Sequence, residues 1–252
     1  MEKAQLEAEV KGLGKVYLIE RPFDESLNAL KEQNAKIVSG RDLAYARITQ
    51  GAKDHVSTYG SYIKQGFLYV PKKGLSLVAE SPILASSEKA TNCHRNGKEF
   101  YPTSKQVEKA LAKSVKVPYD LTAVPTNRFG ENEVTVFLFE DLAEKYGGFL
   151  REHCRINEMP VYKLSKSDVD SQKKPFARQA WLHRVDDGWS DLGGNGRVLY
   201  YSYAVRGVQK ETAEGGSQKI QTYTETDIKN VLRTLKLEGL EGKVLETLRE
   251  KH

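Results

Sequence analysis

The sequence predicts an α+β (mixed α/β) protein, with a central mixed or mostly antiparallel sheet flanked by helices and a C-terminal helical pair. Short apolar runs rich in β-branched and aromatic residues are separated by turn signals, as in strands. Longer segments place apolar residues at helical spacing, and a content of 39% apolar and 29% charged residues suits a packed core. A polar, glycine-containing stretch at 209–222 divides the chain. We therefore expect a core domain over residues 1–208 and a helical hairpin over residues 223–252.

The first half of the chain is expected to mix helices and strands. We predict helices over residues 2–11, 24–34, 40–49 and 103–115, and a strand over residues 15–19. Asp24 is expected to cap its helix, and Thr103 with Gln106 has the spacing of a capping box. Two apolar runs flank the sequence PKKG, which predicts a β-hairpin with Gly74 in its turn.

The second half is expected to begin with a strongly apolar strand. We predict strands over residues 132–140, 159–164 and 197–208, and helices over residues 141–154 and, after a polar loop, within 165–179. The order strand, helix, strand between 132 and 164 resembles one βαβ unit. At the C-terminus, Thr224 and Asp227 have capping-box spacing, and the leucines that follow predict two amphipathic helices.

The charge of the chain is uneven. The formal net charge is +5, and residues 62–116 hold ten basic residues against four acidic ones. A local excess of this kind indicates a polyanion partner such as DNA or RNA. The alternative interpretation is an ordinary solvated basic surface.

Hydropathy indicates a soluble, cytoplasmic protein without membrane contact. No run of about 18 apolar residues is present, and the N-terminus lacks the apolar region of a secretory signal. Phosphate-binding glycine motifs and the zinc-protease motif are also missing from the sequence.

The two cysteines of the chain each adjoin a histidine. Cys93 precedes His94, and His153 precedes Cys154, so a Cys2His2 zinc site is conceivable on residue type. Neighbouring side chains on a helix or strand point in different directions, however. We therefore expect no metal at these residues and interpret both cysteines as buried or free thiols.

The segment WLHRVDDGWSDLGGNGRVLYYSYAVRG, residues 181–207, holds the strongest candidate site. His183 precedes Asp186 by three residues and Asp187 by four, and on a helix both spacings bring a carboxylate to the imidazole. A carboxylate fixes the tautomer of a histidine and stabilises its protonated form, as a general base requires. We therefore predict these three residues as catalytic. The alternative is a solvated loop in which Asp and Gly only form turns.

Cationic and aromatic side chains predict a nucleic-acid footprint around this segment. The predicted contacts are Lys64, Lys72, Lys73, Arg95, Lys98, Arg178, Arg184 and Arg197 to phosphate, and Trp189 by stacking. The lysines of the 59–74 hairpin are interleaved with aromatic residues, which suits a groove that follows a nucleic-acid backbone. Alternatively, the aromatic residues face the core and the lysines shield an edge strand.

A further pattern combines Arg47, the Ser-Thr pair in VSTYGSY (56–62), and Glu131 and Glu133 before an apolar run. It resembles the pattern of ADP-ribosyltransferases. The resemblance implies that one glutamate positions the nicotinamide ribose while the arginine holds the pyrophosphate. Strand-edge glutamates on a solvated face explain the same residues.

The leading interpretation is a nucleic-acid-binding or nucleic-acid-processing protein, with nuclease-like activity at His183. Mg²⁺ is the cofactor that such chemistry would use, although the acidic residues form no complete metal-nuclease pattern. The competing interpretation is a non-enzymatic interaction or assembly module. In that case, the C-terminal helices bind a protein partner or a second copy of the chain. An ADP-ribosyltransferase-like enzyme is the remote alternative.

Overall fold

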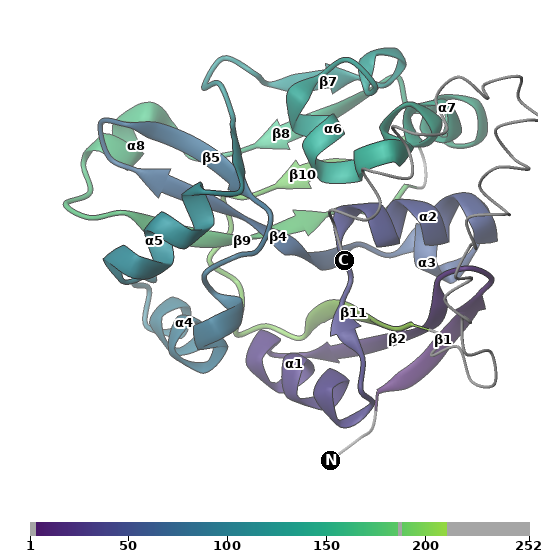
Figure 1. Cartoon of the computed structure of the whole chain (residues 1–252), viewed down its shortest axis with the longest axis horizontal. Helices are drawn as coiled ribbons and strands as arrows, with labels where there is room; N and C mark the ends of the chain where they lie inside the picture. The colour runs from purple at the N-terminus through teal and green to yellow at the C-terminus, as the bar shows by residue number, and fades with distance from the viewer. Residues whose placement is uncertain (1–3, 186–187, 211–252) are drawn as a thin grey trace, which may run out of the picture. The chain divides into compact units, whose positions relative to one another are not determined.

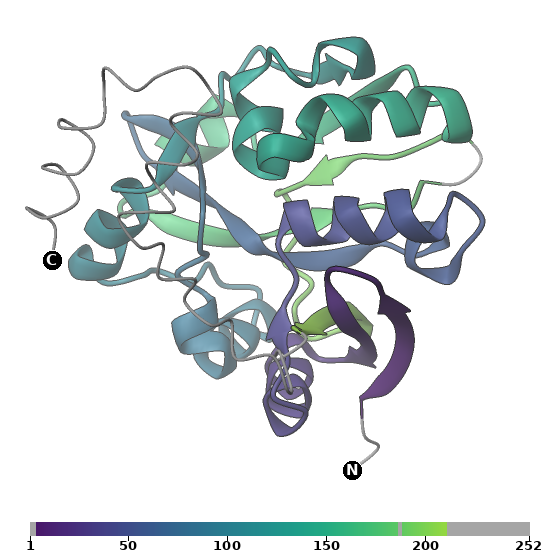
Figure 2. The ribbon, with the colours of Figure 1, turned by 45° about the vertical axis from the view of Figure 1, so that its right-hand side comes forward.

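A computed structural model describes residues 4–185 and 188–210 (Figures 1 and 2). Within these residues a mixed sheet is flanked by helices, which confirms the predicted fold class. The helical pair predicted for residues 223–252, together with Asp186 and Asp187, lies outside the described residues.

The sheet follows the strand order β1-β2-β11-β4-β9-β10-β8-β7 in the described part of the chain. These strands are β1 (Gln5–Val10), β2 (Gly14–Arg21), β4 (Ser61–Val70), β7 (Ala123–Pro125), β8 (Glu158–Tyr162), β9 (Phe176–Leu182), β10 (Leu192–Gly193) and β11 (Tyr203–Gln209). The short strands β3 (Lys36–Ile37), β5 (Gly74–Val78) and β6 (Ser114–Lys116) pair with β11, β4 and β5 respectively. The β11–β4 and β10–β8 pairs are parallel, and the other neighbouring strands in this order pair antiparallel. The sheet is therefore mixed and mostly antiparallel.

Helices surround the sheet (Figure 1), and the apolar side chains between helices and sheet form two cores. One core includes residues of α2 (Gly40–Gln50), α6 (Glu133–Phe139), α7 (Ala143–Cys154) and α8 (Lys166–Asp170). The other includes residues of α1 (Phe23–Glu32), α4 (Ser87–Arg95) and α5 (Ser104–Leu111). The short helix α3 (His55–Thr58) precedes β4, and 3₁₀ turns span Leu84–Ser86, Thr126–Arg128 and Glu140–Leu142. Two cores on opposite faces hold the central strands rigidly between them.

Several local predictions are confirmed. Thr103 and Gln106 form a capping box at α5, and β4 and β5 form the predicted hairpin. Gly74 has φ +106°, and Lys72 in the same turn has φ +63°. Helix α1 begins one residue earlier than expected, because Pro22 occupies the N-cap and Asp24 lies in the first turn.

The strand predicted over residues 132–140 is wrong, because this segment forms helix α6. The side chain of Asn132 accepts hydrogen bonds from the backbone N–H groups of Val134 and Thr135, which caps a helix. The buried residues of α6, Val134, Thr135, Leu138 and Phe139, recur at helical spacing. Capping and packing against α2 and α7 thus override a strand-like composition, and the predicted βαβ unit does not form.

The helix predicted over residues 2–11 is also wrong. Residues 5–10 form β1, which pairs with β2 through a turn in which Gly12 and Gly14 have φ of +81° and +113°. Leu6, Ala8 and Val10 alternate along the sequence at a strand period, which the helical prediction overlooked.

The segment 165–179, predicted as a polar loop leading to a short helix, begins instead with helix α8 and ends in β9, a central strand. Arg178 and Gln179 are both about 4% exposed there, so its polar residues are buried by neighbouring elements. The strand predicted over 197–208 begins only at Tyr203, because residues 194–202 form a loop. This loop borders the candidate site.

Candidate functional site

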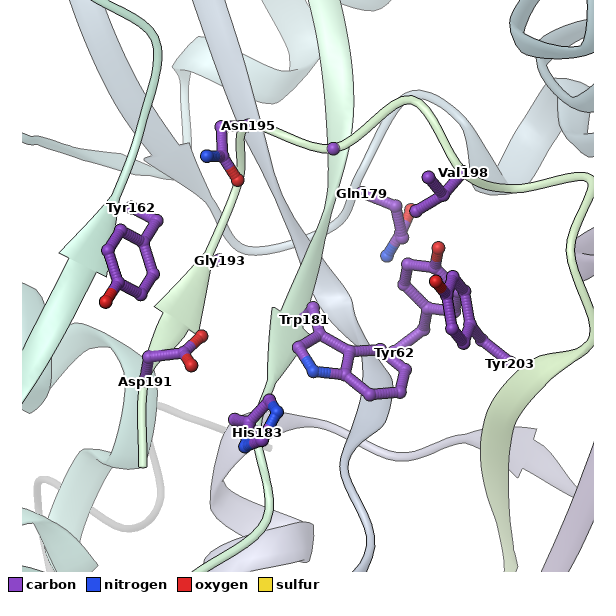
Figure 3. A pocket seen from close by; sticks show the side chains of 11 residues that line it. Tyr62, Tyr162, Gln179, Trp181, His183, Asp191, Gly193, Asn195, Val198 and Tyr203 are labelled. Atoms are coloured by element: carbon purple, nitrogen blue, oxygen red, sulfur yellow. The ribbon is translucent and has the colours of Figure 1, made fainter. Parts of the chain in front are cut away.

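A pocket of about 290 Å³ opens above strands β9 and β10 (Figure 3). It is lined by Tyr62, Tyr162, Gln179, Trp181, His183, Asp191, Gly193, Asn195, Gly196, Val198 and Tyr203. Eight of these eleven residues lie in the 181–207 segment. The sequence therefore identified the main segment of the pocket, but it did not identify Gln179, the contribution of Tyr162, or a role for Tyr62 at this place.

One row of paired residues forms the floor of the pocket. Gly193 is in register with Tyr162 of β8 on one side and with Trp181 of β9 on the other. Partners in register project to the same face of a sheet, and two strand spacings separate their backbones by about 9.6 Å. Tyr162 and Trp181 therefore flank a glycine that has no side chain to fill the space between them (Figure 3).

The Trp181 side of the pocket is a packed aromatic cluster. The ring centroids of Trp181 lie 5.0 Å from Tyr62 and 5.7 Å from Tyr203. A Cβ on Gly60 would overlap the indole, so this glycine permits the position of Trp181. Tyr203 is 43% exposed, so the cluster is anchored in the core at one end and open at the other. Such rings offer a rigid apolar surface to a ligand.

Asp191 and His183 form the next row of the sheet. The backbone N–H of His183 donates to the carbonyl oxygen of Asp191 at 2.9 Å, which places both side chains on the face of the pocket. Oδ2 of Asp191 accepts a hydrogen bond of 3.0 Å from the indole Nε1 of Trp189. Burial raises the pKa of Asp191, while the nearby His183 and the Trp189 hydrogen bond oppose this effect.

Two fully buried side-chain polar atoms in the pocket have no protein partner within the described residues. One is Nδ1 of His183, and the other is Oε1 of Gln179. Nε2 of Gln179 donates to the carbonyl oxygens of Ile63 and Gln65, so the amide orientation is fixed and its oxygen remains an acceptor. Buried polar atoms are normally paired, so these two atoms favour a polar ligand.

Arg178 stabilises the loop that borders the pocket. Its guanidinium is buried and binds both carboxylate oxygens of Glu99, at 3.0 Å and 2.6 Å. It also donates to the carbonyl oxygen of Asn195. Nη1 of Arg197 donates to the carbonyl oxygen of Gly97 at 2.5 Å. The predicted phosphate ligand Arg178 is therefore engaged inside the fold, whereas Arg197 is exposed beside the end of α4.

The other predicted nucleic-acid contacts are distributed over several elements. Arg95 and Lys98 are exposed at the end of α4, near Arg197. Lys72 and Lys73 are exposed in the β4–β5 turn, and Lys64 is half-buried in β4. Arg184 is exposed next to the pocket, and Trp189 is 46% exposed and stacks near Tyr162 at 6.4 Å. Arg197 of the pocket loop bonds to Gly97, which lies two residues after Arg95 and one before Lys98, and it also approaches Glu99 to 3.7 Å.

The two Cys–His pairs lie on different helices, and their cysteines pack in separate cores. Cys93 and His94 belong to α4, and His153 and Cys154 belong to α7, on the other face of the sheet. Burial, with Arg178 and Arg197 nearby, lowers the pKa of His94 to about 4. No group of three potential metal ligands is found among residues 4–185 and 188–210.

The residues of the ADP-ribosyltransferase pattern have roles in the fold. Arg47 is fully buried and donates to the hydroxyl of Tyr146 at 2.9 Å, and to the carbonyl oxygen of Val56. Glu131 is exposed and paired with Arg128 at 3.0 Å, and Glu133 begins helix α6. Glu131 therefore precedes a helix and Glu133 is its first residue, whereas a strand was expected here.

No helix in the described part of the chain is long and apolar enough to cross a membrane.

Comparison with known proteins gives one informative likeness. No protein-family model matches the chain, and neither does any curated protein. A solved structure described under the heading "Accommodation of massive sequence variation in Nanoarchaeota by the C-type lectin fold" is similar at a TM-score of 0.56. It is 14% identical in sequence, and the match covers 80% of this chain and 100% of that one. This chain is therefore similar in fold to a C-type lectin-fold protein.

Proposed function

We propose that the protein is a non-enzymatic binding module that takes up a small ligand in the pocket between Tyr162 and Trp181. The observation that carries this proposal is the combination of exposed aromatic surface with buried polar atoms that have no protein partner. Ligand sites in proteins typically join an apolar lining to a few polar groups that fix orientation. The volume of about 290 Å³ suits a small ligand or one group of a larger one.

Binding is favoured over catalysis because the described pocket presents aromatic faces and buried polar atoms without a protein partner, while Asp186 and Asp187, the expected partners of His183, lie outside the described residues. Among the described residues, no hydrogen bond joins the imidazole to a carboxylate, and the Asp191 side chain bonds to Trp189 instead. The likeness to a fold said to accommodate massive sequence variation supports the same view, because pocket residues can then vary on a constant sheet.

Intrinsic fluorescence tests this proposal directly. Both tryptophans of the chain, Trp181 and Trp189, belong to the pocket region, so an occupied pocket should change their emission. We expect hits from a small-molecule library to raise Tm and to be lost in Trp181→Ala. The matched control is Tyr101→Phe, at an exposed aromatic residue that bonds to Gln172. Hits that bind Trp181→Ala unchanged would contradict the proposal.

A second candidate, nucleic-acid binding, is favoured by a basic cluster of three exposed cations: Arg197 of the pocket loop, whose guanidinium bonds to Gly97, and Arg95 and Lys98, which flank Gly97 in the sequence. Phosphates on this cluster would leave a base free to stack on the exposed aromatic residues. Affinity for labelled DNA or RNA should then fall steeply with salt and weaken in Arg197→Ala. Cleavage that requires Mg²⁺ and His183 would extend the proposal to a nuclease, and the absence of binding at low salt would remove it.

A further inference from the structure

The charge of the pocket differs from the charge of the chain. The protein carries a formal +5, yet neither lysine nor arginine lines the pocket. Asp191 is its one carboxylate among the described lining residues, and it is about 7% exposed. A buried carboxylate whose basic neighbour among the described lining residues is His183, with no lysine or arginine beside it, costs free energy, so its presence at a binding site needs a reason.

One oxygen of this carboxylate faces the floor of the pocket. Oδ2 is occupied by the indole N–H of Trp189. Oδ1 lies 3.6 Å from the point where a Cβ on Gly193 would stand, directly between Tyr162 and Trp181. A ligand seated on Gly193 would therefore meet Oδ1 at hydrogen-bonding range.

The other unpaired oxygen of the pocket is also an acceptor. Oε1 of Gln179 has no donor, and the two hydrogen bonds of its amide nitrogen exclude the flipped orientation. Ammonium, amidinium and guanidinium groups carry only donors, whereas phosphate and carboxylate carry only acceptors. Aromatic faces attract cations as well. Acceptors, rings and one negative charge are complementary to a cationic nitrogen.

Resting on the binding function proposed above, we infer that the pocket selects ligands with a cationic nitrogen group, held over Gly193 by Asp191 and the rings of Tyr162 and Trp181. The chemical class is an organic amine, amidine or guanidine. This class differs from the phosphates expected at the basic cluster, so a nucleic acid would have to bind outside the pocket.

Benzamidine and benzamide test the inference, because they have nearly the same shape and differ in charge. By calorimetric titration of the full chain, we expect benzamidine to bind about tenfold more tightly than benzamide, as a desolvated cation–π contact with a carboxylate allows. This preference should disappear in Asp191→Asn, which keeps the shape of the side chain and an oxygen for Trp189. Glu131→Gln, which removes an exposed carboxylate paired with Arg128, is the matched control and should keep the preference.

The outcomes separate this inference from the proposed function. Equal affinity for both compounds, a preference that survives in Asp191→Asn, or no binding of benzamidine at millimolar concentration would overturn the selection of cations. A neutral compound that binds and is lost in Trp181→Ala would keep the binding function while the cation inference fails. Loss of benzamidine binding in Asp191→Asn together with an unchanged Tm supports the inference and excludes misfolding.

Discussion

Arg178 and Glu99 form a buried ion pair with two hydrogen bonds, Nε to Oε2 at 3.0 Å and Nη2 to Oε1 at 2.6 Å. Their side chains are 5% and 9% exposed. Because Arg178 also bonds to the backbone of Asn195, this pair joins the end of α4 to the pocket loop. The rigidity of the binding surface therefore depends on residues that do not themselves line it.

Removing one partner of this pair should be costly. We expect Glu99→Gln to reduce the free energy of unfolding by about 3 kcal/mol, because the guanidinium of Arg178 is left buried without its full counter-charge. The double variant Glu99→Met, Arg178→Met should lose less than the sum of the single changes. Urea unfolding measures both. A single variant as stable as Glu131→Gln would show that the pair is not needed.

The environment of Glu7 predicts that the protein loses stability in acid through the N-terminal hairpin. Burial acts to raise its pKa, but hydrogen bonds and charge from Arg206, assisted by His55, leave the pKa lowered overall. Arg206 is fully buried and lies 2.6 Å from the Glu7 carboxylate. A lowered folded-state pKa stabilises the protein above the unfolded value, about 4.3, and this stability is lost as the pH falls through the folded value. Glu7→Gln should remove this component of the pH dependence in urea titrations.

The burial of Asp191 predicts an effect of pH on stability that is opposite in sign to the effect of Glu7. Burial raises its pKa, so the folded protein holds this proton more tightly than the unfolded chain does. Its contribution to stability should therefore fall as the pH rises from the ordinary Asp value, about 3.9, through the raised value. In Asp191→Asn this loss should be absent, and Tm near neutral pH should be equal or higher. A lower Tm in the variant would contradict the sign.

The affinity for benzamidine should also depend on pH, through the protonation of Asp191. Protonation of Asp191 removes the negative charge of the pocket, so the binding of a cation should weaken as the pH falls. Calorimetric titration over a pH series checks this expectation. Affinity that rises on acidification would be inconsistent with it.

Ligand binding should require glycine at position 193, because a side chain there would occupy the pocket floor. Its φ is not in the left-handed region, and an added Cβ would meet its nearest neighbours at ordinary distances of 3.6 to 3.9 Å. We therefore expect Gly193→Ala to keep Tm, and Gly193→Leu to weaken benzamidine binding by about tenfold by filling the space between Tyr162 and Trp181. Binding that persists in Gly193→Leu would place the ligand elsewhere.

Asn132 should be needed for helix α6. Replacing it with Ala leaves the N–H groups of Val134 and Thr135 without their side-chain acceptor, which costs about 1 kcal/mol. Urea unfolding of Asn132→Ala measures the effect. Asn92→Ala is the control, because it makes the same change of side chain at an exposed position within α4.

Local signals in the sequence were sufficient for elements that local chemistry stabilises. The capping box of Thr103 and Gln106 and the β4–β5 turn at Gly74 were predicted correctly, because each depends on residues a few positions apart. Local composition failed for α6 and β1. Helix α6 consists of residues that favour strands, but its N-cap and its packing stabilise a helix. Residues 5–10 form strand β1 because they pair with β2.

The sequence by itself determined the fold class and the segment 181–207 that supplies most of the pocket. Only the tertiary structure decided which side chains meet there. Tyr162 comes from β8 and Tyr62 from β4, and strand register aligns both with Trp181. Among the described residues, Asp191 is the carboxylate beside His183, because the backbone N–H of His183 bonds to the carbonyl oxygen of Asp191. Asp186 and Asp187 lie outside the described residues. Register is set by hydrogen bonds between residues far apart in the chain, so local spacing does not encode it.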